Sequence, residues 1–433
     1  MRTFRRARGA FVVASLGLLA LTSPALAQTT PTLEDMQSII QQQQQQQIEA
    51  LQQQMQGMQE KTERMASDAE EARRAATAAQ GAVGALPGDG ALITSGQEKI
   101  RLAISGQVNR LVNVVDDGTT TNVYHADNDN SSTRIRFIGE GDLSSDISIG
   151  TNIEFEIESN STADINQNNQ SSGTANFKDR KIEAYFTSKR FGKISIGQGD
   201  TASNNTAETD LSGTTVVQYS AIGDLAGGMI FNRGEDDFTG ITVNDAFNNF
   251  DGLSRKDRLR YDSPTFYGFS VAGSAIEDDQ FDLAAFFGGG FGNFKLAASG
   301  SWARPDGTTD DRAAGSISAL HEPTGINLTI AGGADWLTKV SNADPAYGYV
   351  KGGWQAEFLD LGKTNIALDY YFGDKICLRC DSSQSASGFI VQEFAGYGTE
   401  VYLGGRVYAL ELNDNTSDPD DIVAGTFGTR VKF

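Results

Sequence analysis

Apolar and polar residues alternate at every second position between residues 147 and 158. One face is largely apolar and the other carries carboxylates: Ile147, Ile149, Thr151, Ile153, Phe155 and Ile157 against Ser148, Asn152, Glu154, Glu156 and Glu158. A period of two predicts a β-strand, and charge confined to one face predicts a wall between hydrocarbon and water. A half-buried strand of a water-soluble sheet would show the same alternation, so this segment alone does not decide between them.

The pattern recurs and predicts sixteen strands between residues 97 and 433. We expect them at 100–115, 134–143, 147–159, 178–188, 192–200, 255–262, 268–276, 281–288, 293–303, 312–321, 325–338, 347–359, 363–375, 387–396, 399–411 and 422–433. Short connections alternate with longer polar ones, as in barrels whose short turns face the periplasm. Because hydrocarbon tolerates no unpaired sheet edge, the sheet must close on itself. The expected fold class is therefore all-β, a 16-stranded antiparallel transmembrane barrel.

The N-terminus has the features of a signal peptide, expected at residues 1–27. Arg2, Arg5, Arg6 and Arg8 precede an apolar run from Ala10 to Leu21, and Ala25-Leu26-Ala27 fits a small-x-small cleavage site. The apolar run is shorter than the roughly 20 residues of a membrane-spanning helix. The paired arginines also occur in twin-arginine signals, but the flanking residues favour ordinary secretion.

Residues 28–86 are expected to form a periplasmic coiled coil. An alternating four-three spacing begins at Leu51 and runs through Met55, Met58, Thr62, Met65, Ala69, Ala72, Ala76 and Ala79. Such a heptad seam is typical of a coiled coil. A seam of methionine and alanine is weak, so a disordered glutamine-rich linker or an isolated helix remain alternatives. Residues 87–96, beginning with Pro87, form the expected linker to the barrel.

Composition excludes some functions but does not exclude a membrane protein. Lysine and arginine total 35 against 56 aspartate and glutamate, for a formal charge of -21, which argues against nucleic acid as a partner. The mean hydropathy of -0.34 resembles that of a soluble protein, yet a barrel averages its two faces to the same value. The two histidines, His125 and His321, lie far apart in sequence. We expect no catalytic residues, no enzyme activity, no cofactor and no metal.

The only two cysteines, Cys377 and Cys380, form a C-L-R-C pair in a polar segment. In a cytosolic βαβ context this spacing would indicate redox chemistry. In an exported chain a small structural disulfide is the favoured interpretation.

The last predicted strand ends on Phe433. Val423, Phe427, Thr429 and Val431 share its parity, while Arg430 and Lys432 lie on the other face. A terminal aromatic residue that closes an amphipathic strand resembles the signal read by the outer-membrane assembly machinery.

Three stretches resemble the general trimeric porins of Gram-negative bacteria. Residues 197–201 (GQGDT) resemble the end of the fifth porin strand, and 258–264 (RLRYDSP) with Gly268-Phe269 resemble the sixth strand and its turn. Residues 399–404 (TEVYLG) resemble the penultimate strand. The helical segment before the barrel is similar to the DcaP-like subgroup, whose members carry organic acids. The resemblance implies a homotrimer of porin-type barrels for passive diffusion of small hydrophilic solutes, with organic anions such as dicarboxylates as candidates.

The connection at residues 201–254 is unusually long, which marks either a functional loop or a misassigned strand. The resemblance implies a loop that folds into the lumen and narrows it. Extra strands at 229–231 or 240–243 remain an alternative. The loop carries six acidic residues: Glu208, Asp210, Asp224, Glu235, Asp236 and Asp237.

Strand parity places basic residues on the lumen face opposite this loop. They are Arg134, Arg136, Lys181, Arg258, Arg260, Arg406 and Arg430. A basic wall facing an acidic loop would set a transverse field across a narrow gap, and arginine can grip a carboxylate with two hydrogen bonds. Equally, these charges could pair with one another and brace the loop.

Two functions follow from these patterns, both in the outer membrane with the N-terminal segment in the periplasm. The first is a diffusion channel, a homotrimer in contact with membrane lipid, lipopolysaccharide and the assembly machinery. The alternative is a structural barrel that tethers the membrane to the cell wall through its helix, with peptidoglycan as partner.

Overall fold

The computed structural model describes residues 99–433, apart from 172–175, 235–236, 306–309, 337–343 and 415–416. The predicted signal peptide (1–27), coiled coil (28–86) and linker (87–96) lie outside the described residues. None of the helices within the described residues is long and apolar enough to cross a bilayer.

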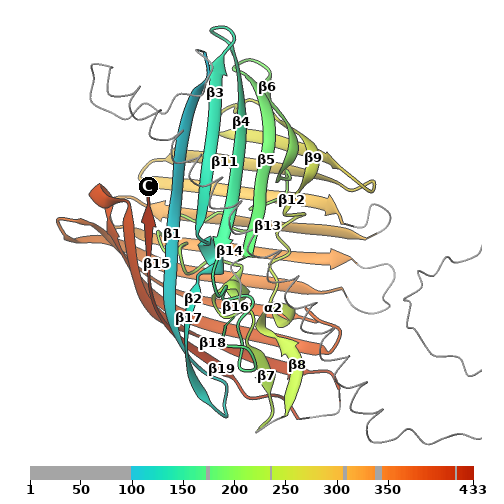
Figure 1. Ribbon diagram of the computed structural model, residues 1–433, viewed down its shortest axis with the longest axis vertical. Helices are drawn as coiled ribbons and strands as arrows, with labels where there is room; N and C mark the ends of the chain where they lie inside the picture. Colours follow the sequence, from blue (N-terminus) through green and yellow to red (C-terminus); the bar gives the residue numbers. More distant parts are fainter. Residues whose placement is uncertain (1–98, 172–175, 235–236, 306–309, 337–343, 415–416) are drawn as a thin grey trace, which may run out of the picture. The chain divides into compact units, whose positions relative to one another are not determined.

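The described part of the chain is built almost entirely of strands (Figure 1). The strands are β1 (Arg101–Asp116), β2 (Thr121–Asp127), β3 (Arg134–Asp142), β4 (Ile147–Glu158), β5 (Asn176–Ser188), β6 (Gly192–Asp200), β7 (Ile230–Asn232), β8 (Phe238–Thr242), β9 (Arg255–Asp262), β10 (Phe269–Ile276), β11 (Phe281–Phe291), β12 (Phe294–Arg304), β13 (Asp311–His321), β14 (Ile326–Trp336), β15 (Ala346–Leu359), β16 (Gly362–Asp374), β17 (Cys380–Phe394), β18 (Thr399–Leu412) and β19 (Ile422–Lys432). The short helices are η1 (Asp129–Ser131), η2 (Ile222–Leu225), α2 (Val243–Ala246) and η3 (Ala395–Tyr397).

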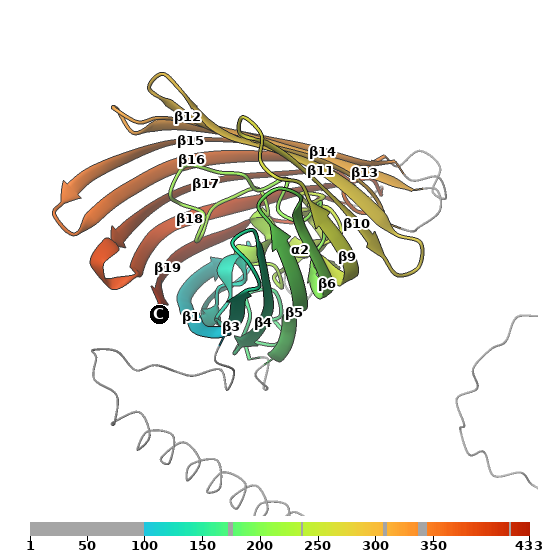
Figure 2. The same ribbon diagram turned by 90° about the horizontal axis from the view of Figure 1, so that it is seen from above.

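Each wall strand pairs antiparallel with its neighbours, and β19 pairs with β1 to close the barrel. The second place in the wall is shared by two strands. β2 pairs with the C-terminal half of β1, and β3 pairs with its N-terminal half. The barrel therefore has sixteen wall positions, as predicted, and Figure 2 shows the wall curving around the segment that fills it.

Most predicted strands match the observed ones to within a few residues, with two differences. The segment 116–133 was expected to be a loop, but it contains β2. The strand expected to begin at residue 387 begins at Cys380. Its first part was missed because the stretch 382–387 is rich in serine and has only Ala386 as an apolar residue on its outward face. Inside the long loop, the alternative of additional strands holds, since β7 and β8 form a hairpin there.

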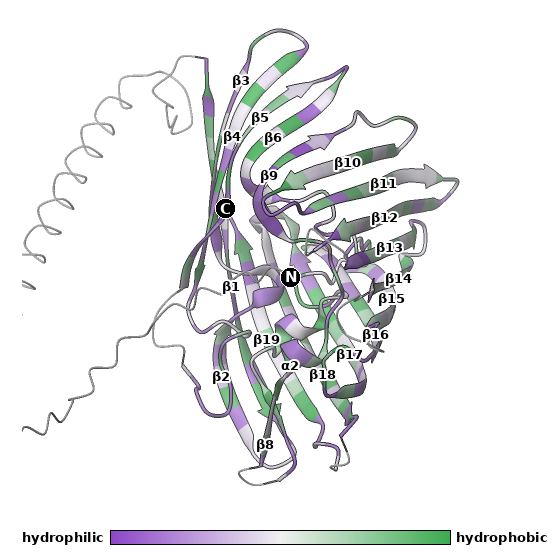
Figure 3. Ribbon diagram, turned by 90° about the vertical axis from the view of Figure 1, so that its right-hand side faces the viewer, coloured by the Kyte–Doolittle hydropathy of each residue, from purple (hydrophilic) through white to green (hydrophobic). Residues whose placement is uncertain are grey.

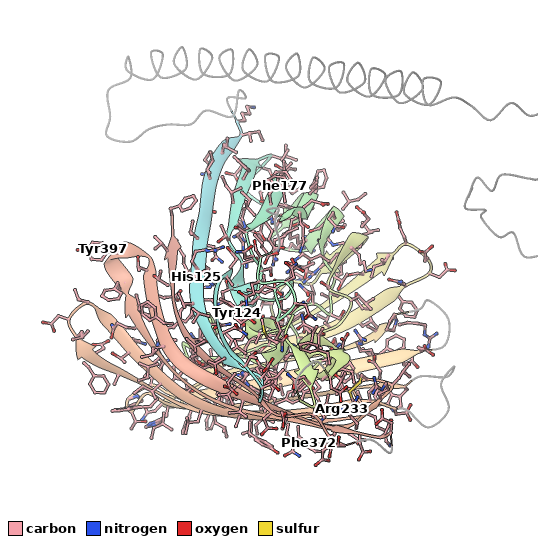
Figure 4. All side chains as sticks on the ribbon, turned by 60° about the horizontal axis from the view of Figure 1, so that its bottom comes forward. Tyr124, His125, Phe177, Arg233, Phe372 and Tyr397 are labelled. Atoms are coloured by element: carbon pink, nitrogen blue, oxygen red, sulfur yellow. A yellow bond between two sulfur atoms is a disulfide. The ribbon has the colours of Figure 1, made fainter. Side chains whose placement is uncertain are left out.

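On the wall strands, many apolar side chains are exposed and many charged side chains are buried. On β4, Ile147 and Ile157 are exposed on the outer surface, whereas Glu154 and Glu158 are buried inside. Figure 3 shows the alternation as green and purple bands along the strands. Tyr124 and its neighbour His125 point to opposite sides of the wall (Figure 4). This inversion is what a wall between lipid and water requires.

Exposed aromatic residues gather at the end of the barrel that carries the short turns. Phe191, Phe266, Tyr267, Phe358, Tyr397 and Phe433 all lie in or next to these turns. Aromatic girdles at the water interface are typical of outer-membrane barrels.

Candidate functional site: the lumen constriction

Residues 201–254 connect β6 to β9 and lie inside the barrel. Hydrogen bonds attach this loop to wall strands far away in sequence. Asn113 Nδ2 donates to Leu225 O at 2.8 Å, Tyr408 OH donates to Ile222 O at 2.9 Å, and Leu211 N donates to Ser318 Oγ at 2.9 Å. The family resemblance implied an inward loop at this place, and these contacts give its path.

The loop has an apolar side that packs against one part of the wall. Phe247 contacts the rings of Tyr371 and Tyr408, with centroid distances of 5.4 and 5.3 Å. The same cluster holds buried residues of β15 to β19, among them Phe389 and Leu410. These positions face the lumen yet are apolar or tyrosine, because the loop covers them.

A polar cavity of about 630 Å³ lies between the other side of the loop and the wall. Five arginines line it, Arg134, Arg180, Arg255, Arg312 and Arg430, from strands β3, β5, β9, β13 and β19. Five acidic residues line it as well: Asp129 of η1, Glu156 of β4, and Glu208, Asp224 and Asp251 of the loop. We call this cavity the constriction.

All five arginines are bound to carboxylates of the wall or lie close to one. Arg312 binds Asp335 through Nε and Nη2, each at 2.7 Å. Arg430 Nε contacts Glu400, and Arg180 pairs with both Glu154 and Glu156. Arg134 lies 3.7 Å from Glu154. Much of the basic charge is therefore compensated within the wall.

Arg255 differs from the other four arginines. Its Nε lies 3.4 Å from the carboxylate of Asp200 on β6 and is buried without a hydrogen-bond partner among the described residues. About a quarter of the side chain is exposed. Asp200 therefore compensates the charge of Arg255, as wall carboxylates do for the other four arginines.

The acidic residues of the loop accept hydrogen bonds from uncharged donors. Tyr219 OH donates to Asp224 at 2.6 Å, Asn249 Nδ2 donates to Glu208 at 3.0 Å, and Ala207 N donates to Asp251 at 2.8 Å. Ion pairs among the described residues include none of these three carboxyls.

Burial raises the pKa values of these acids. Burial raises the pKa of Asp224 to about 6, opposed by the Tyr219 hydrogen bond and aided by the Glu158 carboxylate. Burial likewise raises the pKa of Asp251 to about 6, against two backbone hydrogen bonds and the positive charges of the nearby arginines. Burial and the neighbouring Asp251 and Asp224 raise the pKa of Glu208 well above its usual range. The loop therefore titrates close to neutral pH.

A register shift explains why Arg180 lines the constriction. Glu154 of β4 pairs with Lys181, but the next residue, Phe155, pairs with Asp179, so β5 carries an extra residue. Such a bulge lets two successive side chains point to the same face. Arg180 and Lys181 both point inward, where Lys181 pairs with Asp200. Simple parity predicts only one of them.

Three other predicted basic residues line a second, smaller cavity of about 260 Å³ within the lumen. Lys181, Arg258 and Arg260 are part of its lining. Arg258 pairs with Glu183 and donates to Gly197 O, and Arg260 binds Asp262. Their donors are used in bracing the wall.

The remaining charged residues predicted for the pore lie elsewhere. Arg406 is buried beneath the loop and binds Asp369 at 2.7 and 3.0 Å. Asp210 is also buried, against Lys351. Asp210 lies on the side of the loop that faces this part of the wall, and neither residue lines the constriction. Arg136 pairs with Glu154 outside the cavity lining, and Asp237 pairs with Arg233 on the β7–β8 hairpin. Glu235 and Asp236 lie outside the described residues.

Six charged residues of the constriction were absent from the predicted site: Arg180, Arg255, Arg312, Asp129, Glu156 and Asp251. Strand parity could have identified Arg312 as an inward residue, because it lies an odd number of positions from the outward residue Ile317 on β13. Asp129, Asp251 and Arg255 lie in or next to irregular segments, where the sequence shows no period.

The disulfide and the terminal residue are both part of the described structure. Cys377 and Cys380 are bonded to each other in the connection between β16 and β17. Phe433 exchanges backbone hydrogen bonds with Gly106 and exposes 65% of its surface. Its role as an assembly signal remains a prediction. Among the described residues, no group of three or more His, Cys, Asp or Glu is arranged to hold a metal ion.

The comparisons with known proteins point to the same closed barrel. The sequence model of the Gram-negative porins matches residues 75–411. The chain belongs to the Gram-negative porin family. Membership and the barrel together place this porin in the outer membrane as a channel protein. A comparison with curated proteins found no match.

Solved structures share the porin's fold at low sequence identity. An anion-selective porin from Comamonas acidovorans is 14% identical, over 77% of this chain and 100% of that chain, with a TM-score of 0.52. OmpT, an outer membrane protein of Vibrio cholerae, is 12% identical over 79% and 100%, also at 0.52. The outer membrane channel DcaP of Acinetobacter baumannii is 12% identical over 78% and 98%, at 0.49. These likenesses concern the fold alone, and the narrower DcaP-like assignment stays a prediction.

Proposed function

We propose that this porin is a passive diffusion channel for small hydrophilic solutes, assembled as a homotrimer. The observation that carries the proposal is the constriction itself, a polar cavity of about 630 Å³ inside a wall whose outer surface is apolar. Solutes would pass between the loop carboxyls and the arginines of the wall. Organic anions such as dicarboxylates are candidates through the resemblance to the DcaP-like subgroup.

Conductance of the purified protein in planar bilayers tests this proposal. A channel gives discrete conductance steps, and closure in three steps would indicate a trimer. A salt gradient then yields the reversal potential and hence the ion preference. The alternative, a structural barrel that tethers the membrane to peptidoglycan through residues 28–86, predicts no conductance.

The outer surface and the C-terminus suggest further partners. Exposed apolar side chains around the wall would contact membrane lipid and lipopolysaccharide, and Phe433 would be read by the assembly machinery. Residues 28–86 are proposed as the periplasmic segment.

A further inference from the structure

The hairpin β7–β8 is the part of the loop that lies at the mouth of the barrel. Figure 1 shows it at the end opposite to the short turn between β3 and β4. Short turns of such barrels face the periplasm, so this mouth is the external one. Three external connections hold β7 there: Gln167 Nε2 donates to Ile230 O at 2.7 Å, Thr119 Oγ1 donates to Asn232 Oδ1 at 3.1 Å, and Asp420 N donates to Asn232 O at 2.8 Å.

The other strand of the hairpin, β8, is held by an arginine of the connection between β16 and β17. Arg379 Nη1 donates to Thr239 O of β8 at 3.0 Å. The same guanidinium group donates to Asp414 in the β18–β19 connection, from Nε at 3.1 Å and from Nη2 at 2.8 Å. Hydrogen bonds from a charged donor are among the stronger ones in proteins. Arg379 thus joins three segments that are far apart in the sequence.

The disulfide fixes the backbone that carries Arg379. Cys377 and Cys380 are bonded on either side of it, and Cys380 N donates to Cys377 O at 3.0 Å. Cys380 is fully buried at the start of β17, where it pairs with Leu412 of β18. Asn413 N donates to Arg379 O at 2.9 Å. A turn closed in this way presents the guanidinium group in few directions, whereas an open turn of the same residues would sample many.

The two cysteines differ in their access to solvent. Cys380 is 0% exposed, whereas Cys377 is half-buried at the edge of the apolar cluster that the loop forms with the wall. The two residues between them are exposed, Leu378 at 80%. A small thiol in the external medium can therefore approach the disulfide from the side of Cys377.

We infer that the disulfide between Cys377 and Cys380 is a thiol-exchange site, at which a small dithiol from the external medium opens the turn and loosens β8. A thiolate of the dithiol attacks Cys377 Sγ, the bond between the two protein sulfurs breaks, and Cys380 leaves as a thiolate that takes up a proton. The second thiol of the reagent then displaces Cys377, which also becomes a thiol. Two electrons and two protons pass from the reagent to the protein, and the reagent becomes a cyclic disulfide.

Opening the disulfide should weaken the contact between Arg379 and Thr239 while the loop stays in place. The hydrogen bonds of β7 and the packing of Phe247 on Tyr371 and Tyr408 are made by other segments. The expected effect is a more mobile β8 at the mouth, with larger fluctuations of the current through an open channel. The inference goes beyond the proposed channel function, because motion of β8 can be measured without conductance.

Hydrogen–deuterium exchange of the full-length protein in detergent tests the inference at residues 238–242 of β8. We expect exchange there to become about tenfold faster in dithiothreitol, the effect of losing one hydrogen bond of a charged group. Residues 326–336 of β14 are the internal reference, and their exchange should not change. Alkylation followed by mass measurement of the intact protein shows whether the disulfide has opened.

Variants separate the disulfide from the arginine that it positions. Arg379→Gln removes the contact with β8 while the disulfide stays closed, so it should speed exchange in β8 by a similar factor and make it insensitive to dithiothreitol. Arg304→Gln is the matched control, since Arg304 is also partly exposed and binds a carboxylate, Asp311, at another external connection. Its exchange and its response to dithiothreitol should equal those of wild type. Cys377→Ser/Cys380→Ser should reproduce the reduced state without reagent.

Each outcome bears on the inference in a defined way. A disulfide that resists dithiothreitol in the folded barrel would overturn the exchange site. Equal exchange in β8 before and after reduction would overturn the control of β8, as would a full response to reduction in Arg379→Gln. Absence of ionic conductance together with the expected exchange response would instead reject the proposed channel alone, which is a distinguishable failure.

Discussion

The ammonium group of Lys351 on β15 contacts the carboxylate of Asp210 in the loop at 2.5 Å, and both side chains are buried. Lys351 Nζ also donates to Thr214 Oγ1 and to Gln218 O, at 3.1 and 2.6 Å. Three loop residues thus converge on one lysine of the wall. This contact fixes the loop to the side of the barrel that its apolar residues cover.

Breaking this ion pair should destabilise the folded barrel. Lys351→Met leaves the Asp210 carboxylate buried without a partner, which costs about 3–5 kcal/mol. We expect a lower unfolding temperature in detergent and noisier open-channel currents. The double variant Lys351→Met/Asp210→Leu removes both charges and should regain most of the stability. Equal stability of wild type and single variant would show that the pair does not anchor the loop.

Ion preference should depend on pH near 6. Above that value Asp224 and Asp251 are ionised, and below it they are neutral, because burial raises the pKa of each to about 6. The arginines keep their charge throughout, so acidification makes the constriction more positive. Reversal potentials measured between pH 7.5 and pH 5 should therefore shift towards chloride.

A matched variant tests the origin of this pH effect. Asp224→Asn/Asp251→Asn should make the shift of the reversal potential smaller across the same range. The charged and titratable neighbours of Asp224 include Tyr219, Glu158, Asp129 and Glu208. Tyr219 stays protonated because burial raises its pKa well above the usual range. An undiminished shift in the double variant would assign the titration to other groups.

Gly106 allows the barrel seam to close around the terminal aromatic ring. A Cβ at this position would lie 2.6 Å from the ring of Phe433 and 2.7 Å from Arg134 O. Gly106→Ala should therefore reduce the folded fraction, read as heat-modifiable mobility on a detergent gel. Gly348→Ala is the control, since a Cβ there meets no atom within 4 Å. Equal folded fractions would show that the seam adapts freely.

Phe433 should matter more for assembly in the cell than for the stability of the finished barrel. Its ring is 65% exposed, so Phe433→Ala removes little packing. We expect a clear loss of protein from the outer membrane but near-normal refolding of purified protein in detergent. Equal yields in both settings would argue against its role as an assembly signal.

The wall could be predicted from sequence because its physics is periodic. Every outward position such as Ile147 meets lipid and every inward position such as Glu154 meets the lumen, so alternation alone gives the strands and the closure. β2 escaped prediction because its outward face has a single large apolar residue, Val123, between Thr121 and His125. The first part of β17 was missed for a similar reason, because its stretch 382–387 is rich in serine.

The constriction could be predicted only in outline. Parity gave Arg134 and Arg430 correctly but missed Arg180, because a single extra residue in β5 resets the alternation. No periodic pattern in the sequence shows which side of the loop packs against the wall. Asp210 and Arg406 were therefore expected in the pore, although they lie where the loop and the wall are in contact. Pairing between distant strands decides which charges remain available, and that information is absent from local sequence.

The apolar packing of the loop limits how this porin could be regulated. Moving the loop away from the wall would expose Phe247, Tyr371 and Tyr408 to water. Exposing each large apolar side chain costs about 1.5–3 kcal/mol. The loop would therefore almost never swing open as a hinged gate. Permeation is then governed by the protonation and rotamers of a few side chains that line the constriction, whose width is otherwise constant.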